Sequence, residues 1–162
     1  MRSRSNKIIA LVFAAVAMFA FGSDGYRPTF GPTAAVAQNG AAKVAPDHGY
    51  VIVLRGLMNI WSRGMDTVAK ELEARGVRVH LENHRHWKEL AAELAKKYET
   101  DKSIAPIIIV GHSLGANAAV LMAGKLGQYR VPVRLIVTFD GMAHTEDSVG
   151  TVSYNVEEVL NF

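Results

Sequence analysis

The sequence predicts one α/β domain with a three-layer α/β/α arrangement, in which helices cover both faces of a mostly parallel β-sheet. Three observations lead to this fold class. Short apolar runs of strand length alternate along the chain with longer segments of helical periodicity. The runs are apolar on both faces, which is typical of strands that helices cover on either side. Alternating strands and helices, joined by right-handed crossovers, then give a parallel sheet.

The first half of the domain supplies two strands and two helices. Residues 50–54 are a continuous apolar run and form the first predicted strand. Apolar residues share one helical face over 65–72, and Gly76 closes this helix as its C-cap. Residues 77–81 alternate between apolar and polar side chains and predict the second strand, and 87–98 again show helical spacing.

The second half continues the alternation. Residues 106–110 predict a third strand, followed by a helix over 116–126. Residues 134–139 predict a fourth strand that ends at Asp140, and a fifth begins within 155–162. The turns after the first, third and fourth strands should lie together, because the carboxyl ends of parallel strands share one edge, where ligands bind.

The N-terminal segment has the composition of an export signal. Arg2, Arg4 and Lys7 precede an uninterrupted apolar run over 8–21, which has signal-peptide length and is short for a membrane span. The same three residues account for the whole excess of 18 basic over 15 acidic residues, so the rest of the chain gives no support for nucleic-acid binding. We expect residues 1–22 to be a signal peptide or an N-terminal membrane anchor.

The remaining chain divides into a linker and a domain. Residues 23–47 contain Gly, Pro, Ala, Ser and Asn without apolar periodicity and predict a flexible linker to the domain at 48–162. We expect a periplasmic or secreted protein, or one anchored in the inner membrane through residues 1–22 if that segment is not cleaved. The chain has no cysteine, which excludes a disulfide framework and a thiol nucleophile.

The pentapeptide Gly111-His112-Ser113-Leu114-Gly115 lies between the third predicted strand and the helix after it. A G-x-S-x-G match in this context predicts a nucleophile elbow with Ser113 at its tip. Gly111 and Gly115 are required because the turn is too tight for side chains. His112 is the second elbow residue, and its side chain is expected to point away from the serine.

A serine nucleophile needs oxyanion donors and an acid that orients its base. The donors are predicted to be the backbone N–H of Leu114 and the turn at Gly56 and Leu57, after the first strand. Asp140, directly after the fourth strand, is the predicted acid. Asp147 and Glu146 are the alternatives.

Three possibilities remain for the general base that activates Ser113. His144 satisfies the chain order Ser, Asp, His, although it lies only four residues after Asp140. His84 and His86 lie in a polar loop at the same edge of the sheet. The third source is a histidine beyond residue 162. Two histidines two residues apart are weak evidence for a metal site. We therefore predict no metal. We also predict no cofactor, because the chain lacks a phosphate-binding glycine loop.

From residue 48 to 162 the chain resembles the α/β-hydrolase superfamily, in particular small exported bacterial members of the lipase, esterase or thioesterase type. The elbow, the Leu-Arg-Gly-Leu turn at 54–57 and the strand end at 137–140 carry the resemblance. It implies that Ser113 is the nucleophile and Asp140 the acid, and that Gly56, Leu57 and Leu114 form the oxyanion hole.

Two departures from the family pattern accompany the resemblance. Many relatives have His-Gly where this chain has Arg55-Gly56, which changes the chemistry of the pocket. Relatives also carry the catalytic histidine in a loop after the last strand. The resemblance therefore implies a chain shortened at its C-terminus, without the final strand and the histidine loop.

Together these features predict a serine hydrolase that cleaves a small-molecule ester or thioester through an acyl-serine intermediate. The alternative is a non-catalytic binding or interaction protein of the cell envelope that has the α/β-hydrolase fold and lacks the catalytic histidine.

Overall fold

The computed structural model describes residues 49–57, 63–141 and 152–162 of the chain. The expected signal segment, 1–22, and linker, 23–47, lie outside these residues. The described elements run in the order β1 (Tyr50–Arg55), α2 (Arg63–Ala74), β2 (Val79–Asn83), η1 (His84–His86), α3 (Trp87–Thr100), η2 (Lys102–Ile104), β3 (Ile107–His112), α4 (Leu114–Gln128), β4 (Val133–Phe139) and β5 (Val159–Asn161).

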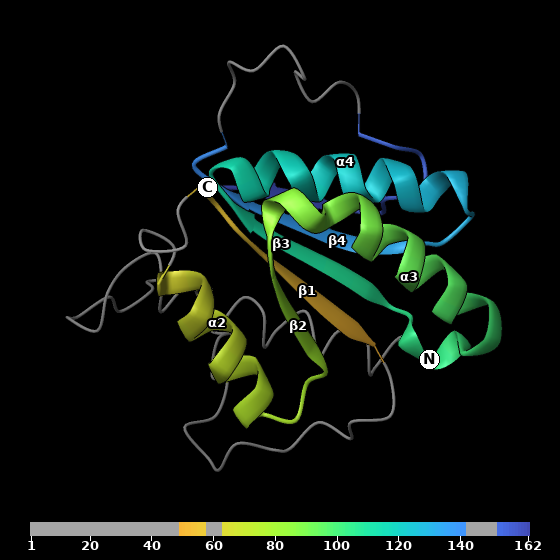
Figure 1. Ribbon diagram of the computed structural model, residues 1–162, viewed down its shortest axis with the longest axis horizontal. Helices are drawn as coiled ribbons and strands as arrows, with labels where there is room; N and C mark the ends of the chain where they lie inside the picture. Colours follow the sequence, from red (N-terminus) through yellow and green to blue (C-terminus); the bar gives the residue numbers. More distant parts are fainter. Residues whose placement is uncertain (1–48, 58–62, 142–151) are drawn as a thin grey trace, which may run out of the picture.

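The five strands form one parallel sheet in the order β2–β1–β3–β4–β5 (Figure 1). This confirms the predicted parallel α/β fold. From β1 the chain passes through α2 to β2 at one edge, whereas from β3 it passes through α4 to β4 in the opposite direction. The neighbours β1 and β3 therefore form the topological switch point of the sheet, and ligands bind at the carboxyl ends of strands at such a point.

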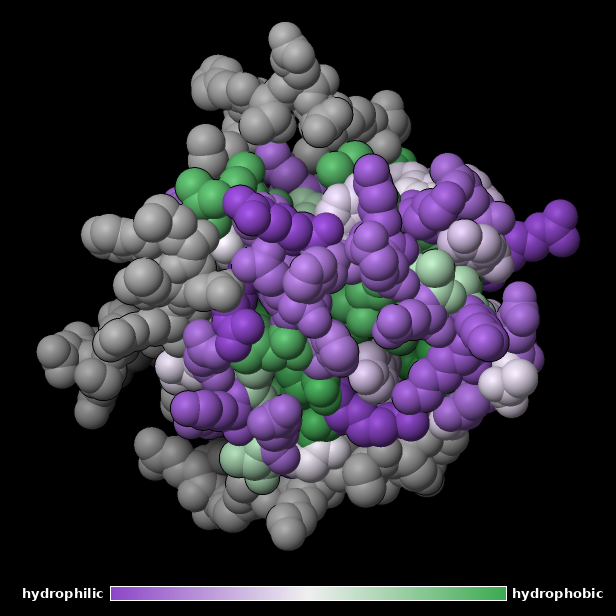
Figure 2. All heavy atoms as spheres, in the orientation of Figure 1, coloured by the Kyte–Doolittle hydropathy of each residue, from purple (hydrophilic) through white to green (hydrophobic). Residues whose placement is uncertain are grey.

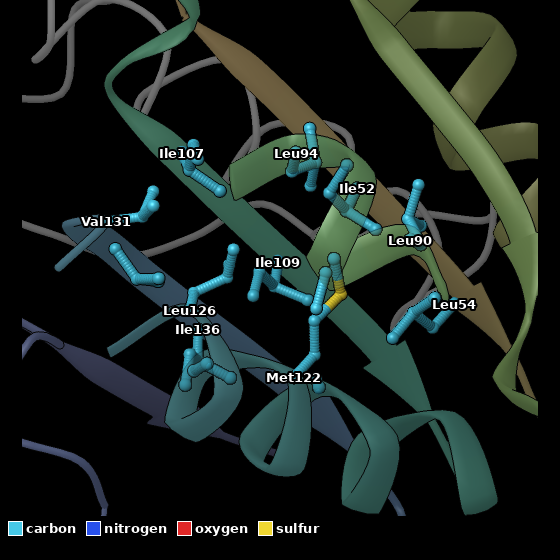
Figure 3. Packing of buried hydrophobic residues seen from close by; sticks show 14 of the residues in the cluster. Ile52, Leu54, Leu90, Leu94, Ile107, Ile109, Met122, Leu126, Val131 and Ile136 are labelled. Atoms are coloured by element: carbon cyan, nitrogen blue, oxygen red, sulfur yellow. The ribbon is translucent and has the colours of Figure 1, made fainter. Parts of the chain in front are cut away.

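Helices cover both faces of the sheet. Along β1, Ile52 and Leu54 belong to the core beneath α3 and α4, while Val51 and Val53 belong to the core beneath α2. Fully burying one such side chain contributes about 1.5–3 kcal/mol to stability. Figure 3 shows the α3/α4 side, where side chains from three strands and two helices meet: Ile52, Leu54, Leu90, Leu94, Ile107, Ile109, Met122, Leu126 and Ile136.

The outward side of α3 is mostly hydrophilic (Figure 2). Exposed residues of α3 are chiefly lysines and glutamates, which is the usual pattern for a helix with one face against a core and the other in water. In the part of the chain that the structure describes, no helix is long and apolar enough to cross a membrane.

The second strand begins later than the sequence predicts. β2 starts at Val79, and the predicted start at residue 77 is wrong. The N–H of Val77 caps α2 by donating to the Leu72 carbonyl at 3.0 Å, after Gly76 with a φ of 82°. Gly76 is therefore the predicted C-cap, and Val77 takes part in the cap rather than in the sheet.

The helix after the elbow starts earlier than predicted, at Leu114 rather than at residue 116. The predicted fifth strand is confirmed as β5, which pairs with β4. Asn155 holds the segment before β5 in place, because its Nδ2 donates to the carbonyls of Ala123, at 3.1 Å, and Val131, at 2.8 Å.

Candidate active site

Ser113 lies between the last residue of β3 and the first residue of α4, in the predicted strand–turn–helix arrangement. Its backbone has φ 56° and ψ −123°, a region that residues with a side chain rarely occupy. Such a conformation costs about 1–3 kcal/mol and is found mainly at functional sites. Among the described residues the Ser113 side chain makes no capping bond to α4, so the start of the helix does not occupy its hydroxyl.

The two elbow glycines are required for different steric reasons. A Cβ atom on Gly111 would lie 2.2 Å from the carbonyl oxygen of Gly115, within the turn itself. A Cβ atom on Gly115 would lie 2.2 Å from the carbonyl oxygen of Leu54, on the neighbouring strand β1. The first glycine lets the chain turn, and the second lets α4 begin directly against β1.

The turn after β1 lies beside the elbow. Leu54 and Gly111 are register partners in adjacent parallel strands, so the two chains leave the sheet at the same level. Gly56 is buried, and Leu57 is about half exposed, with a relative accessibility of 48%. The topology therefore brings the predicted oxyanion residues, Gly56, Leu57 and Leu114, to the switch point with Ser113.

Asp140 follows β4, which is the neighbour of β3 on the other side. Its φ is 46°, and its side chain is 85% exposed. The Ser113 N–H donates to the Phe139 carbonyl at 2.8 Å, and the Asp140 N–H donates to the Phe162 carbonyl at 3.1 Å. The strand end before Asp140 is thus bonded to the elbow, while Asp140 itself is bonded to the C-terminal residue, whose label lies near the start of α4 in Figure 1.

The carboxylate of Asp140 faces a side chain that sequence analysis did not assign to it. Nε2 of His112 lies 3.6 Å from Oδ2 of Asp140, and the His112 side chain is four-fifths buried. This contact is an ion pair when the imidazole is protonated. The signal that could have found it is the adjacency of β3 and β4, which places the last residues of the two strands side by side.

The structure describes two of the candidate bases, His84 and His86. His144 lies outside the described residues, as do the alternative acids Glu146 and Asp147. His84 and His86, predicted in a loop, instead form η1, which Asn83 caps by accepting a hydrogen bond from the Arg85 N–H at 3.0 Å. In the described ranges, no hydrogen bond or ion pair joins either histidine to Ser113 or Asp140.

Glu82 is the partner of His86. Oε1 of Glu82 lies 3.1 Å from Nδ1 of His86, and Oε2 lies 3.7 Å from Nε2 of His80. The pKa of the Glu82 carboxyl is held below its usual value, first by the Asn83 N–H, which donates to Oε1 at 2.7 Å, and then by His86. Burial opposes the shift. In the ranges that the structure describes, no group of three or more His, Asp or Glu side chains is arranged to hold a metal ion.

The sequence model of one protein family, the thioesterase domain, matches residues 48–160, well over half of the chain. A comparison with curated protein sequences gave no significant match. The matched residues contain β1 to β4, the first two residues of β5 and the elbow, so the family match covers most of the fold and the site described above. The chain therefore belongs to the thioesterase-domain family of the α/β-hydrolase superfamily, a family of hydrolases that act on esters or thioesters.

Proposed function

We propose that this chain hydrolyses a small-molecule ester or thioester through an acyl-serine intermediate on Ser113. The observation that carries the proposal is the backbone of Ser113, held at φ 56° and ψ −123° between β3 and α4. A strained serine at the switch point of a parallel sheet is the geometry of a nucleophile elbow. The family match supports the same class of reaction.

In the proposed mechanism, Oγ of Ser113 attacks the carbonyl carbon of the substrate while a base takes the hydroxyl proton. The carbonyl oxygen becomes an oxyanion that the N–H groups of Leu57 and Leu114 stabilise. Losing one such donor typically costs about 3–4 kcal/mol in the transition state. The intermediate expels the alcohol or thiol, which takes the proton from the base, and water then releases the acid from Ser113.

Asp140 is proposed as the acid that orients the base. It follows β4 directly, and β4 is bonded to the elbow through the Ser113 N–H. His144 is the proposed base within this chain. Labelling of Ser113 in this chain by a serine-directed probe would favour His144.

Thioester hydrolysis tests the proposal. The chain and its Ser113→Ala variant are incubated with short-chain acyl-coenzyme A, and the released thiol is measured. We expect release that depends on Ser113. Equal release by the two proteins would contradict the assignment of the nucleophile.

The second candidate is a binding protein of the cell envelope that uses the same fold without catalysis. It is favoured by one observation: within the described ranges, the Asp140 carboxylate pairs with His112 of the elbow rather than with His84 or His86. Saturable binding of an acyl ligand without turnover, unaffected by Ser113→Ala, would support this candidate over hydrolysis.

We also propose that residues 1–22 direct the chain out of the cytoplasm. The basic residues before an apolar run of 14 residues support this assignment. Expression in a bacterium with fractionation tests it. A mature protein beginning near Ser23 in the periplasm would support cleavage, while an intact chain in the membrane would indicate an anchor.

A further inference from the structure

An ion pair joins the end of β1 to the first turn of α2. The guanidinium of Arg55 donates from Nη2 to Oδ1 of Asp66 and from Nε to Oδ2, the latter at 3.4 Å. This two-point contact fixes the orientation of a planar guanidinium as well as its distance. Both side chains are mostly buried, with relative accessibilities of 24% for Arg55 and 31% for Asp66.

The direction of the Arg55 side chain follows from strand alternation. Val51 and Val53 pack beneath α2, so Arg55, two residues further, points to the same face. Asp66 follows Met65, a buried residue of the α2 face, in the first turn of the helix. The pair therefore links the end of β1 to the first turn of α2.

The same strand end is held on its other side by the elbow. Gly115 packs against the backbone of β1, where an added Cβ would lie 2.2 Å from the carbonyl oxygen of Leu54 and 3.0 Å from that of Arg55. The backbone of Leu54 and Arg55 is thus fixed between α4 and α2. Gly56 and Leu57, the proposed oxyanion residues, follow this fixed point directly.

We propose that the Arg55–Asp66 pair is a positioning device for the oxyanion hole. By clamping Arg55 to α2, Asp66 sets where the N–H of Leu57 lies relative to the N–H of Leu114 and to Ser113. Arg55 and Asp66 are positioning residues that act through the backbone of the turn. This inference rests on the proposed function, because it assigns the pair a part in the reaction at Ser113.

The expected effect follows from the sensitivity of catalysis to geometry. A displacement of about 1 Å in a group that contacts the reacting atoms costs on the order of a hundredfold in rate. Loss of the clamp should therefore reduce the reactivity of Ser113 more than it reduces the stability of the fold. It should also lower kcat with little change in KM, because the oxyanion forms only after the substrate is bound.

The test compares Asp66→Asn, Arg55→Met and Arg55→Lys with a matched control on the same helix. Glu71→Gln breaks the ion pair between Glu71 and Arg75, in which Oε2 lies 3.6 Å from Nη2. This pair lies more than one turn beyond Asp66 along α2. The readout is the second-order rate of labelling of Ser113 by a fluorophosphonate, whose phosphoryl oxygen occupies the oxyanion hole. Thermal unfolding monitors the fold.

We expect Asp66→Asn and Arg55→Met to label about 10- to 100-fold more slowly than the unmutated chain. Arg55→Lys keeps the charge but loses the two-point contact. Its labelling rate should lie between the rates of these two variants and that of the unmutated chain. Glu71→Gln should label at a rate within about twofold of the unmutated chain, since this pair joins two residues of α2 and does not contact β1. Unchanged labelling of Asp66→Asn, or an equal loss in Glu71→Gln, would overturn the inference.

A second measurement separates this inference from the proposed function. Backbone order parameters of the Gly56 and Leu57 amides report the rigidity of the turn directly and do not depend on catalysis. Asp66→Asn should lower them from about 0.85 toward 0.6. If the unmutated chain is not labelled, the nucleophile assignment fails, and unchanged order parameters would then overturn the positioning role as well.

Discussion

Gly115 and Leu54 meet through backbone atoms alone. A Cβ atom added to Gly115 would lie 2.2 Å from the carbonyl oxygen of Leu54, closer than any real contact allows. Because Leu54 lies in β1, which pairs with a strand on each side, it cannot move away without disturbing the pairing of β1 with β2 and β3. The start of α4 is therefore fixed against β1 by the absence of a side chain.

This contact predicts that replacing two glycines of α4 with alanine has opposite effects on stability. Gly115→Ala should destabilise the fold by about 3 kcal/mol or prevent folding, because the clash is with backbone. Gly124→Ala has nothing within 4 Å of the added methyl and should stabilise the fold by about 0.5–1 kcal/mol. Chemical unfolding of both variants measures this, and equal stabilities would show that α4 does not pack on β1 as described.

The backbone of Ser113 predicts a gain in stability from glycine. Ser113→Gly removes the steric conflict at φ 56°, whereas Ser113→Ala retains it. We expect the glycine variant to be more stable than the alanine variant by about 1 kcal/mol. Urea unfolding compares the two, and an alanine variant at least as stable as the glycine variant would mean that the serine is not strained.

Asp140 is predicted to matter for turnover and not for folding. Asp140→Asn should reduce turnover by a factor on the order of 10⁴, because the amide cannot orient and stabilise a protonated base. Asparagine tolerates the positive φ of this position, so unfolding should be little changed. Unchanged turnover would move the acid to Asp147 or Glu146.

A companion variant tests the contact between Asp140 and the elbow. If Asp140 serves a base other than His112, replacing His112 with Asn should reduce turnover much less than Asp140→Asn does. Equal losses in the two variants would show that the pair with His112 is the function of the carboxylate.

Glu82 predicts a stability difference that depends on pH. The pKa of the Glu82 carboxyl is lowered in the folded chain. The ionised carboxylate therefore stabilises the fold at every pH above 4.5, the ordinary pKa of this group. That contribution is lost as pH falls from 4.5 through the lowered folded pKa. Glu82→Gln should therefore lower Tm at pH 7 and match the unmutated chain at the acid end. A difference that is constant from pH 7 to pH 3 would contradict the role of the ionised carboxyl.

The sequence predicts the elements that depend on local patterns. Short stretches of sequence are enough to identify them. The apolar runs predict β1, β3 and β4, and the two elbow glycines predict the tight turn between β3 and α4. The start of β2 was missed for a physical reason. Val77 is apolar and continues an alternating pattern, but its N–H is taken by the cap of α2, so it cannot join the sheet.

The parts of the site that depend on spatial neighbours could not be predicted in the same way. Arg55 and Asp66 are eleven residues apart, and their pairing depends on α2 packing across the face that carries Val51 and Val53. The contact of His112 with Asp140 depends on β3 and β4 being adjacent. Neither contact leaves a signature in local periodicity.

Fluorophosphonate labelling measures whether Ser113 is an activated nucleophile. The chain and its Ser113→Ala variant are shown to be folded by circular dichroism, exposed to the probe and compared by intact mass. We expect one added phosphonyl group on the unmutated chain and none on the variant. An unlabelled but folded chain, or equal labelling of both proteins, would contradict this assignment.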